Sequence, residues 1–201
     1  MNKVSFKITL IVLTFLFIFS ACKKSDNSDD FDTLFFSDDT TAAAELVADA
    51  NEDLNKIKIM YKRNEVQLEE LKAAMGDRDI EKVKKIADEL VYVINDGMAL
   101  GEKAVEKINR AEQMNINADF KEYLSLKEES LQKQLEAFEN RRQAALLLRD
   151  VFGTANPAAI EKAKLGFKEK EEKFMKTLET SREINKKANE LAKESAKKGK
   201  E

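Results

Sequence analysis

The sequence contains no histidine, no tryptophan, one cysteine and one proline among its 201 residues. Without histidine the chain has no His–Asp catalytic pair, no histidine-ligated metal and no Glu-x-x-His pair of the kind found in di-iron bundles. One proline and six glycines are too few for the many tight turns of a β-sandwich or a β-barrel. These absences exclude several classes of enzyme and argue against an all-β fold.

The chain is rich in residues that favour long helices. Charged residues make up 36% of it, and Ala, Glu, Lys and Leu are abundant. The helical pattern breaks at Gly76-Asp77, at 115–119 and at 153–157, where Gly and Asn or Asp supply helix ends and Pro157 suits a first helical position. The breaks predict helices over 40–75, 78–114, 118–152 and 157–196.

Short connections between long helices force neighbours to run antiparallel, so the predicted fold is an all-α, up-down-up-down four-helix bundle over residues 40–196. Apolar residues recur in alternating steps of three and four, which is typical of coiled-coil-like heptad packing. The predicted seam residues are Ala50, Leu54, Ile57, Tyr61, Asn64, Leu68, Leu71 and Met75; Ile80, Val83, Ala87, Leu90, Ile94, Gly97, Gly101, Ala104, Ile108 and Ala111; Phe120, Leu124, Leu131, Leu135, Phe138, Ala145, Leu148 and Phe152; and Ile160, Phe167, Phe174, Leu178, Ile184, Ala188 and Leu191.

Residues 1–21 have the organisation of a cleaved signal peptide. Lys3 and Lys7 precede an uninterrupted run of apolar residues and threonine from 8 to 19, and small residues follow. Twelve helical residues rise about 18 Å, which is short of the roughly 30 Å hydrocarbon core of a bilayer. This length favours a signal peptide over the alternative, a transmembrane anchor.

The segment Phe19-Ser20-Ala21-Cys22 resembles the lipobox of bacterial lipoproteins, with phenylalanine where leucine is usual. The resemblance covers 22 residues. It implies that the Cys22 thiol receives a diacylglycerol, that the chain is cut before Cys22, and that the new amine is acylated. Two or three acyl chains give stable anchoring to a membrane. Lys23, in place of aspartate, resembles outer-membrane sorting, so the expected location is the bacterial envelope, on the outer membrane rather than the inner one.

Residues 22–39 carry repeated Asp among Ser and Asn, which predicts a flexible acidic tether. Leu34, Phe35 and Phe36 interrupt it, either as a staple onto the domain or as a partner-docking patch. Residues 197–201 are expected to form a frayed basic tail. Loss of the two lysines in 1–21 takes the net charge from −3 to −5, which argues against nucleic-acid binding.

Two groups of residues inside the predicted bundle are candidate sites. Counted from the helix starts, Asn64, Glu89 and Arg141 or Arg142 fall at one level, which predicts a polar core layer with a Glu–Arg pair. A seam asparagine commonly fixes helix register, and catalysis would need a nucleophile or a second acid that this layer lacks.

Gly97 and Gly101 lie four residues apart on the second predicted helix. We interpret them as a packing notch that receives a bulky neighbour such as Phe138 or Phe174. A small apolar pocket or a flexible hinge is the alternative, because two glycines weaken a helix interior.

The chain contains no glycine-rich phosphate loop, no zinc-binding spacing and no nucleophile–base motif. We therefore expect no enzyme activity and no cofactor. The expected function is a non-enzymatic interaction or adhesion protein on the outer membrane or cell surface, anchored through acylated Cys22. The alternative is a periplasm-facing scaffold or chaperone-like accessory. The expected partner is a protein or a polyanionic macromolecule, the latter suggested by the lysines after residue 185, and self-association stays open.

Overall fold

The computed structural model describes residues 39–154 and 156–198. These residues form four α-helices, α1 (Thr40–Asp77), α2 (Ile80–Glu112), α3 (Ala118–Phe152) and α4 (Pro157–Lys198), and they contain no β-strand. The predicted all-α fold with four helices is confirmed, and each helix end lies within two residues of its predicted position. Among the described residues, no helix has the length and apolar character needed to span a membrane. The predicted signal peptide, Cys22 and the tether up to residue 38 lie outside the described residues.

Side-chain caps explain where three of the helices begin. The Asp79 carboxylate accepts a hydrogen bond from the backbone N–H of Lys82 at the start of α2. Asn117 Oδ1 accepts from the backbone N–H of Phe120 at 2.8 Å at the start of α3. Asn156 Oδ1 accepts from two backbone N–H groups in the first turn of α4. Each cap satisfies helix-end donors that have no partner inside the helix.

The glycines do not end the helices as the sequence predicted. Gly76 lies inside α1, and Arg78 takes the left-handed conformation that follows the helix, with φ of 57°. The N-cap of α2 is therefore Asp79 and not Asp77. Gly153 has φ of −72°, in the right-handed region, so its freedom to adopt a positive φ is not used. Local hydrogen bonds, rather than glycine flexibility, set these two connections.

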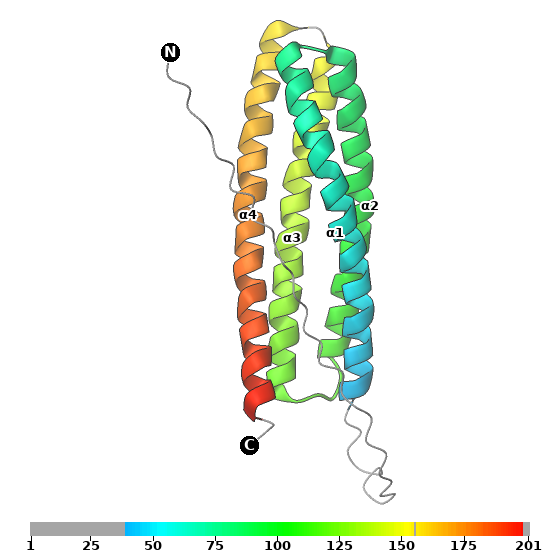
Figure 1. The fold of residues 1–201 in the computed structure, drawn as a ribbon, viewed down its shortest axis with the longest axis vertical. Helices are drawn as coiled ribbons and strands as arrows, with labels where there is room; N and C mark the ends of the chain where they lie inside the picture. The colour runs from blue at the N-terminus through cyan, green and yellow to red at the C-terminus, as the bar shows by residue number, and fades with distance from the viewer. Residues whose placement is uncertain (1–38, 155, 199–201) are drawn as a thin grey trace, which may run out of the picture. The chain divides into compact units, whose positions relative to one another are not determined.

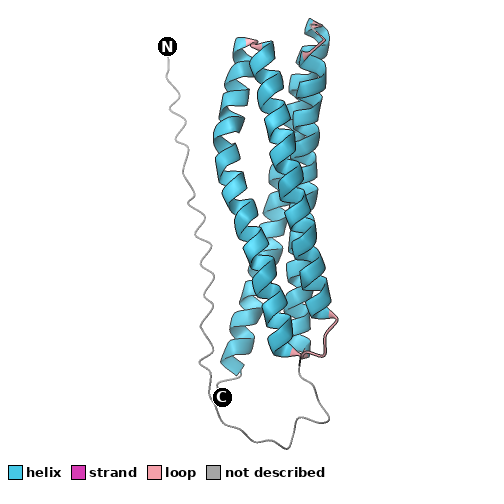
Figure 2. Ribbon diagram, turned by 90° about the vertical axis from the view of Figure 1, so that its right-hand side faces the viewer, coloured by secondary structure: helices cyan, strands magenta, loops and turns pink. Residues whose placement is uncertain are grey.

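Consecutive helices lie side by side (Figures 1 and 2): α1 packs on α2, α2 on α3, and α3 on α4. Among the described residues, α1 and α4 do not pack along their lengths. They meet at mid-height, where the rings of Tyr61 and Phe174 stack with their centroids 6.3 Å apart. The contact between α1 and α4 is therefore the weakest of those between neighbouring helices.

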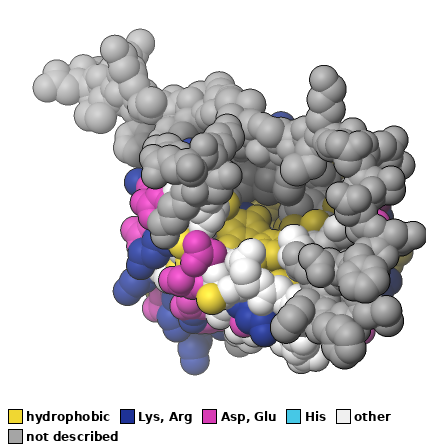
Figure 3. All heavy atoms as spheres, turned by 90° about the horizontal axis from the view of Figure 1, so that it is seen from below, with side chains coloured by type: hydrophobic (Ala, Val, Ile, Leu, Met, Phe, Trp, Pro, Cys, Tyr) yellow, Lys and Arg dark blue, Asp and Glu magenta, His cyan; other side chains and the backbone are white. Residues whose placement is uncertain are grey.

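The upper half in Figure 1 (residues 64–94 and 141–171) has an apolar core to which all four helices contribute. The lower half (residues 40–57, 101–131 and 181–198) has an apolar core built by α1, α2, α3 and Ile116 of the α2–α3 connection. A small aromatic cluster lies between them, formed by Tyr61, Phe138 and Phe174 with Ala137 and Leu178. Figure 3 shows hydrophobic side chains at the centre of the lower end and charged ones at its rim, where described residues are visible.

Every predicted seam residue is buried or partly buried in the structure. The pattern of the sequence thus locates the inward face of each helix. It does not locate several polar residues that share this face, and they form the sites described next.

Candidate functional site

A small cavity lies at mid-height between α1, α2 and α3. Its volume, counted over the positions that the centre of a water molecule can occupy, is about 20 Å³. A cavity needs roughly 10–15 Å³ by this measure to hold one water molecule, so this one has room for about one water and not for a metabolite. The lining is mostly apolar, with Asn64 and Arg141 among the lining residues.

Asn64 lines this cavity from α1 and is 9% exposed. Asn64 and Arg141 contribute an amide and a guanidinium group to an otherwise mostly apolar lining.

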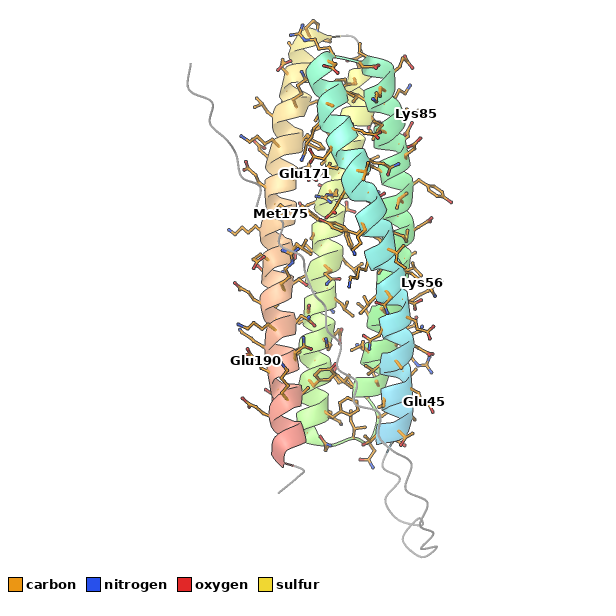
Figure 4. The ribbon with its side chains drawn as sticks, viewed as in Figure 1. Glu45, Lys56, Lys85, Glu171, Met175 and Glu190 are labelled. Atoms are coloured by element: carbon orange, nitrogen blue, oxygen red, sulfur yellow. The ribbon has the colours of Figure 1, made fainter. Side chains whose placement is uncertain are left out.

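Arg141 of α3 joins three helices at the same level. Its Nε and one terminal guanidinium nitrogen donate to the two carboxylate oxygens of Glu171, on α4, at 2.9 and 2.8 Å. The guanidinium carbon lies 3.5 Å from the ring centroid of Phe174 and 5.5 Å from that of Tyr61. Figure 4 labels Glu171 on α4. The side chains of Arg141 and Glu171 are only 8% and 15% exposed, so this bidentate pair is a structural link and not a free charge.

The structure places together only part of the predicted polar layer. Asn64 and Arg141 both line the cavity. Glu89 is exposed on α2 and accepts a hydrogen bond from a glutamine of α1 at 3.0 Å, while Arg142 pairs with a glutamate one turn earlier in α3. The acidic partner of Arg141 is Glu171 and not Glu89, because Glu89 points to solvent. Asn64 and Arg141 thus lie close together, whereas Glu89 lies on the exposed side of α2.

The two glycines of α2 have different surroundings. A Cβ added to Gly101 would lie 2.5 Å from Leu135 Cδ2, so a leucine of α3 fills this notch and not Phe138 or Phe174. A Cβ added to Gly97 would meet no atom within 4 Å, and Gly97 lines the cavity. The predicted notch is therefore limited to Gly101, and the alternative of a small pocket describes Gly97.

A second polar site lies in the lower half, between α3 and α4. Lys127 is 8% exposed, and its Nζ donates to Oδ1 of Asn185 at 2.6 Å and of Asn189 at 3.2 Å. It also lies 5.5 Å from the ring centroid of Tyr123. Burial lowers the pKa of Lys127 to about 8 and raises the pKa of Tyr123 to about 12. Two asparagine side chains of α4 thus accept hydrogen bonds from the ammonium group in a poorly solvated site.

Two further contacts join the lower parts of α3 and α4. Ser130 and Ser181 each donate to the other's backbone carbonyl, at 2.9 and 2.8 Å, and both are buried. Nearer the end of α4, Ser195 Oγ donates to the Asp119 carboxylate at 3.0 Å. Reciprocal serine bonds require the two helix backbones to lie close together.

Acidic side chains elsewhere in the lower half are already engaged. Asp53 accepts hydrogen bonds from Lys107 at 2.8 Å and Lys56 at 3.1 Å, and the bond from Lys107 is the main cause of its lowered pKa. Burial, together with the neighbouring Glu128, raises the pKa of Glu112. Among the described residues, no group of three or more His, Cys, Asp or Glu side chains could hold a metal ion.

Most of these polar residues were not predicted from the sequence, although the apolar seams contain a signal for some of them. The apolar steps skip a position in α3 after Leu124 and again after Phe138, and the skipped positions are those of Lys127 and Arg141. In α4 the skipped positions include Glu171 and Ser181. Several gaps in the seams thus coincide with buried or partly buried polar residues, whereas the gap between Ile160 and Phe167 contains the buried Ala163.

No family model, no curated protein and no solved structure matches this chain.

Proposed function

We propose that this chain is a membrane-anchored bacterial lipoprotein that acts as a non-enzymatic interaction or adhesion protein on the outer membrane or cell surface. The observation that carries the proposal is the lipobox-like segment 19–22 directly after a twelve-residue run of apolar residues and threonine. In this proposal Cys22 carries the lipid, residues 23–39 form the tether, and the helices stand away from the membrane.

Within the same proposal, the four helices form an up-down-up-down bundle with heptad packing. The short connections and the burial of the seam residues support this arrangement. A non-enzymatic role is supported by the use of the interior polar groups. Arg141 is bonded to Glu171, and Lys127 is bonded to two asparagines, so these groups join helices. The outer faces of long helices would then be the surface that contacts a partner.

The anchor is tested by replacing the single cysteine. Cells producing the parent chain, Cys22→Ala or the tether control Ser25→Ala are grown with labelled palmitate, and the purified chains are analysed by mass. We expect the parent and Ser25→Ala to carry the label and to lack residues 1–21. We expect Cys22→Ala to carry no label and to keep those residues. A parent chain without label, or a labelled Cys22→Ala chain, would refute the lipoprotein assignment.

The orientation is tested by protease treatment of intact cells. Digestion of the helical domain with a periplasmic control protein left intact supports the surface location. Protection of the domain would replace the surface role with the alternative, a periplasm-facing scaffold or chaperone-like accessory.

A further inference from the structure

One side of the α1–α2 pair carries several exposed apolar side chains. Among the described residues, the exposed large hydrophobic side chains are two on α4 and three on α1 and α2, namely Ile59 (55% exposed), Val66 (63%) and Tyr92 (69%). Residue numbers increase upward in α1 and downward in α2 (Figure 1). With the hydrogen bond from Gln67 to Glu89 as the reference height, Tyr92 therefore lies between the heights of Ile59 and Val66. Exposed apolar side chains that gather in this way commonly mark a contact surface.

Charged side chains flank the three apolar ones, in opposite order on the two helices. Toward the upper end α1 carries Glu70 and α2 carries Lys85, whereas toward the lower end α1 carries Lys56 and α2 carries Asp96. All four are exposed, and each is three, four or seven residues from an apolar residue of the group, so they lie on the same stripe of their helix. Figure 4 labels Lys56 on α1 and Lys85 on α2. We call these four charged and three apolar residues the α1–α2 face.

We propose that the α1–α2 face binds the same face of a second copy of this chain, in a dimer whose two-fold axis runs parallel to the helices. A rotation of 180° about such an axis keeps every residue at its own height and sets α1 of one copy against α2 of the other. Tyr92 of each copy then lies between the heights of Ile59 and Val66 of the other copy. At the upper end of the contact, Glu70 of each copy lies opposite Lys85 of the other.

The order of the charges favours a second copy as the occupant. The rotation brings the acidic upper end of one stripe onto the basic upper end of the other, and the basic lower end, at Lys56, toward the acidic one, at Asp96. Because the contact is symmetric, each attraction occurs twice. A face with charges of one sign would repel its own copy, whereas this one is complementary to itself. An apolar centre with a charged rim is also the usual composition of a protein contact surface.

The direction of the axis rests on the proposed lipid anchor, whereas the contact itself does not. The first residue of α1, Thr40, lies at the lower end in Figure 1. An axis parallel to the helices keeps the lower ends of both copies on one side, so that two anchors can enter one membrane. An axis perpendicular to the helices would set α1 against α1, with Glu70 opposite Lys56, and would direct the two lower ends away from each other.

Disulfide cross-linking in intact cells tests this arrangement. Full-length chains with Glu70→Cys and full-length chains with Lys85→Cys are produced together, carry different tags, and are treated with a mild oxidant. We expect a linked dimer that contains both tags. Either variant produced alone should give little linked dimer, because identical positions lie on opposite helices of the contact.

Two controls limit the interpretation. Chains without an introduced cysteine show whether Cys22 forms links, and Asp150→Cys with Glu161→Cys, exposed on α3 and α4, should give no linked dimer. Absence of the mixed dimer, or linkage of Glu70→Cys to Lys56→Cys in place of Lys85→Cys, would overturn the proposal. The palmitate label is measured separately, so a mixed dimer of chains without label would support the contact and refute only the anchor.

The apolar centre is tested in the same cross-linking pair. Tyr92→Ser should lower the yield of linked dimer at least about fivefold, because truncating an aromatic residue at the centre of a contact often removes much of its binding energy. Leu165→Ser is the matched control, since Leu165 is a similarly exposed apolar residue on α4 (65%) and should leave the yield unchanged. Equal yields for Tyr92→Ser and the control would contradict the proposed contact.

Charge reversal tests the complementarity of the face. Two differently tagged copies without introduced cysteines are purified together from membranes in mild detergent. Glu70→Lys in both copies should lower their co-purification several-fold, because the rotation then sets lysine against lysine. Adding Lys85→Glu to both copies should restore it, because the reversed charges attract again. Circular dichroism verifies that the variants fold, and a folded double variant that does not recover would contradict the pairing of these two positions.

Discussion

The upper and lower halves of the four helices are joined by different kinds of interaction. In the upper half all four helices contribute to one apolar core, which includes Phe152 and Leu148, 1% and 0% exposed. In the lower half the largest apolar cluster is formed by α1, α2, α3 and their connection, and α4 adds the buried residues Ile184 and Ala188 beside its serine, asparagine and lysine contacts with α3. The same helix α4 is thus an integral part of one half and a peripheral part of the other.

The difference shows that burial and stabilisation are separate properties. Ser181 and Ala188 are fully buried, as are many residues of the upper core. Removing apolar surface from water stabilises in proportion to its area, whereas burying a hydroxyl or an ammonium group gives at best a small net gain. We therefore expect the upper half to determine global stability and the lower half to open first.

The largest expected effect is in the upper core. Phe152→Ala should reduce the free energy of unfolding by about 3–5 kcal/mol, because it removes a fully buried ring and leaves a cavity. Ile184→Ala, in the lower half of α4, should cost less than about 2 kcal/mol, because Ile184 lies outside the three apolar clusters and we expect this part of α4 to open before the global transition. Urea denaturation followed by circular dichroism measures both. Equal losses for the two variants would remove the proposed difference between the halves.

The next effect is a pH dependence that originates in the lower half. The folded-state pKa of Lys127 is lowered to about 8, so above pH 8 the unfolded chain binds more protons than the folded one, and stability rises with pH up to about 10. The gain should reach at most about 2–3 kcal/mol. Above pH 10 the raised pKa of Tyr123 acts in the opposite direction, because the unfolded chain then loses the tyrosine proton first.

Chemical denaturation between pH 7 and 11 measures this dependence in the parent and in Lys127→Met. The variant should lack the rise between pH 8 and 10. An identical rise in both chains would assign it to other groups.

A smaller effect distinguishes the two glycines between the halves. Gly101→Leu should destabilise by about 1–3 kcal/mol, because its side chain would overlap Leu135. Gly97→Ala should stabilise by up to about 1 kcal/mol, because the added methyl group enters open space and alanine favours a helix. Thermal and urea denaturation of the two variants test this. A destabilising Gly97→Ala would indicate that the cavity must keep its full volume.

The smallest effect concerns exposed ion pairs. Lys72 and Glu69 form a contact of 2.8 Å, but their side chains are 47% and 73% exposed. Lys72→Ala should change the free energy of unfolding by less than about 0.5 kcal/mol, because solvent screens such pairs. The same denaturation assay serves as a baseline for the other variants. A loss above 1 kcal/mol would mean that surface charges stabilise the upper half as well.

Helix positions and inward faces were predictable because they follow from local residue preferences and from a repeating apolar pattern. The caps at Asn117 and Asn156 are examples, because an N-cap side chain bonds only to backbone N–H groups in the first turn of its own helix. The partners of polar residues were not predictable. Arg141 selects Glu171 over Glu89 because of the rotation of each helix about its axis, and a pattern of spacings does not determine that rotation within one residue. The filling of the Gly101 notch by Leu135 depends on the same rotation.

Hydrogen exchange along α4 tests the central claim most directly, because one helix passes through both halves. Native-state exchange of the backbone amides, measured at one pH over a series of low urea concentrations, gives an opening free energy for each segment. We predict that amides of residues 160–178 exchange through global unfolding, whereas those of residues 182–195 exchange through a local opening of clearly lower free energy and weaker urea dependence. Equal opening free energies along the whole of α4 would contradict the account.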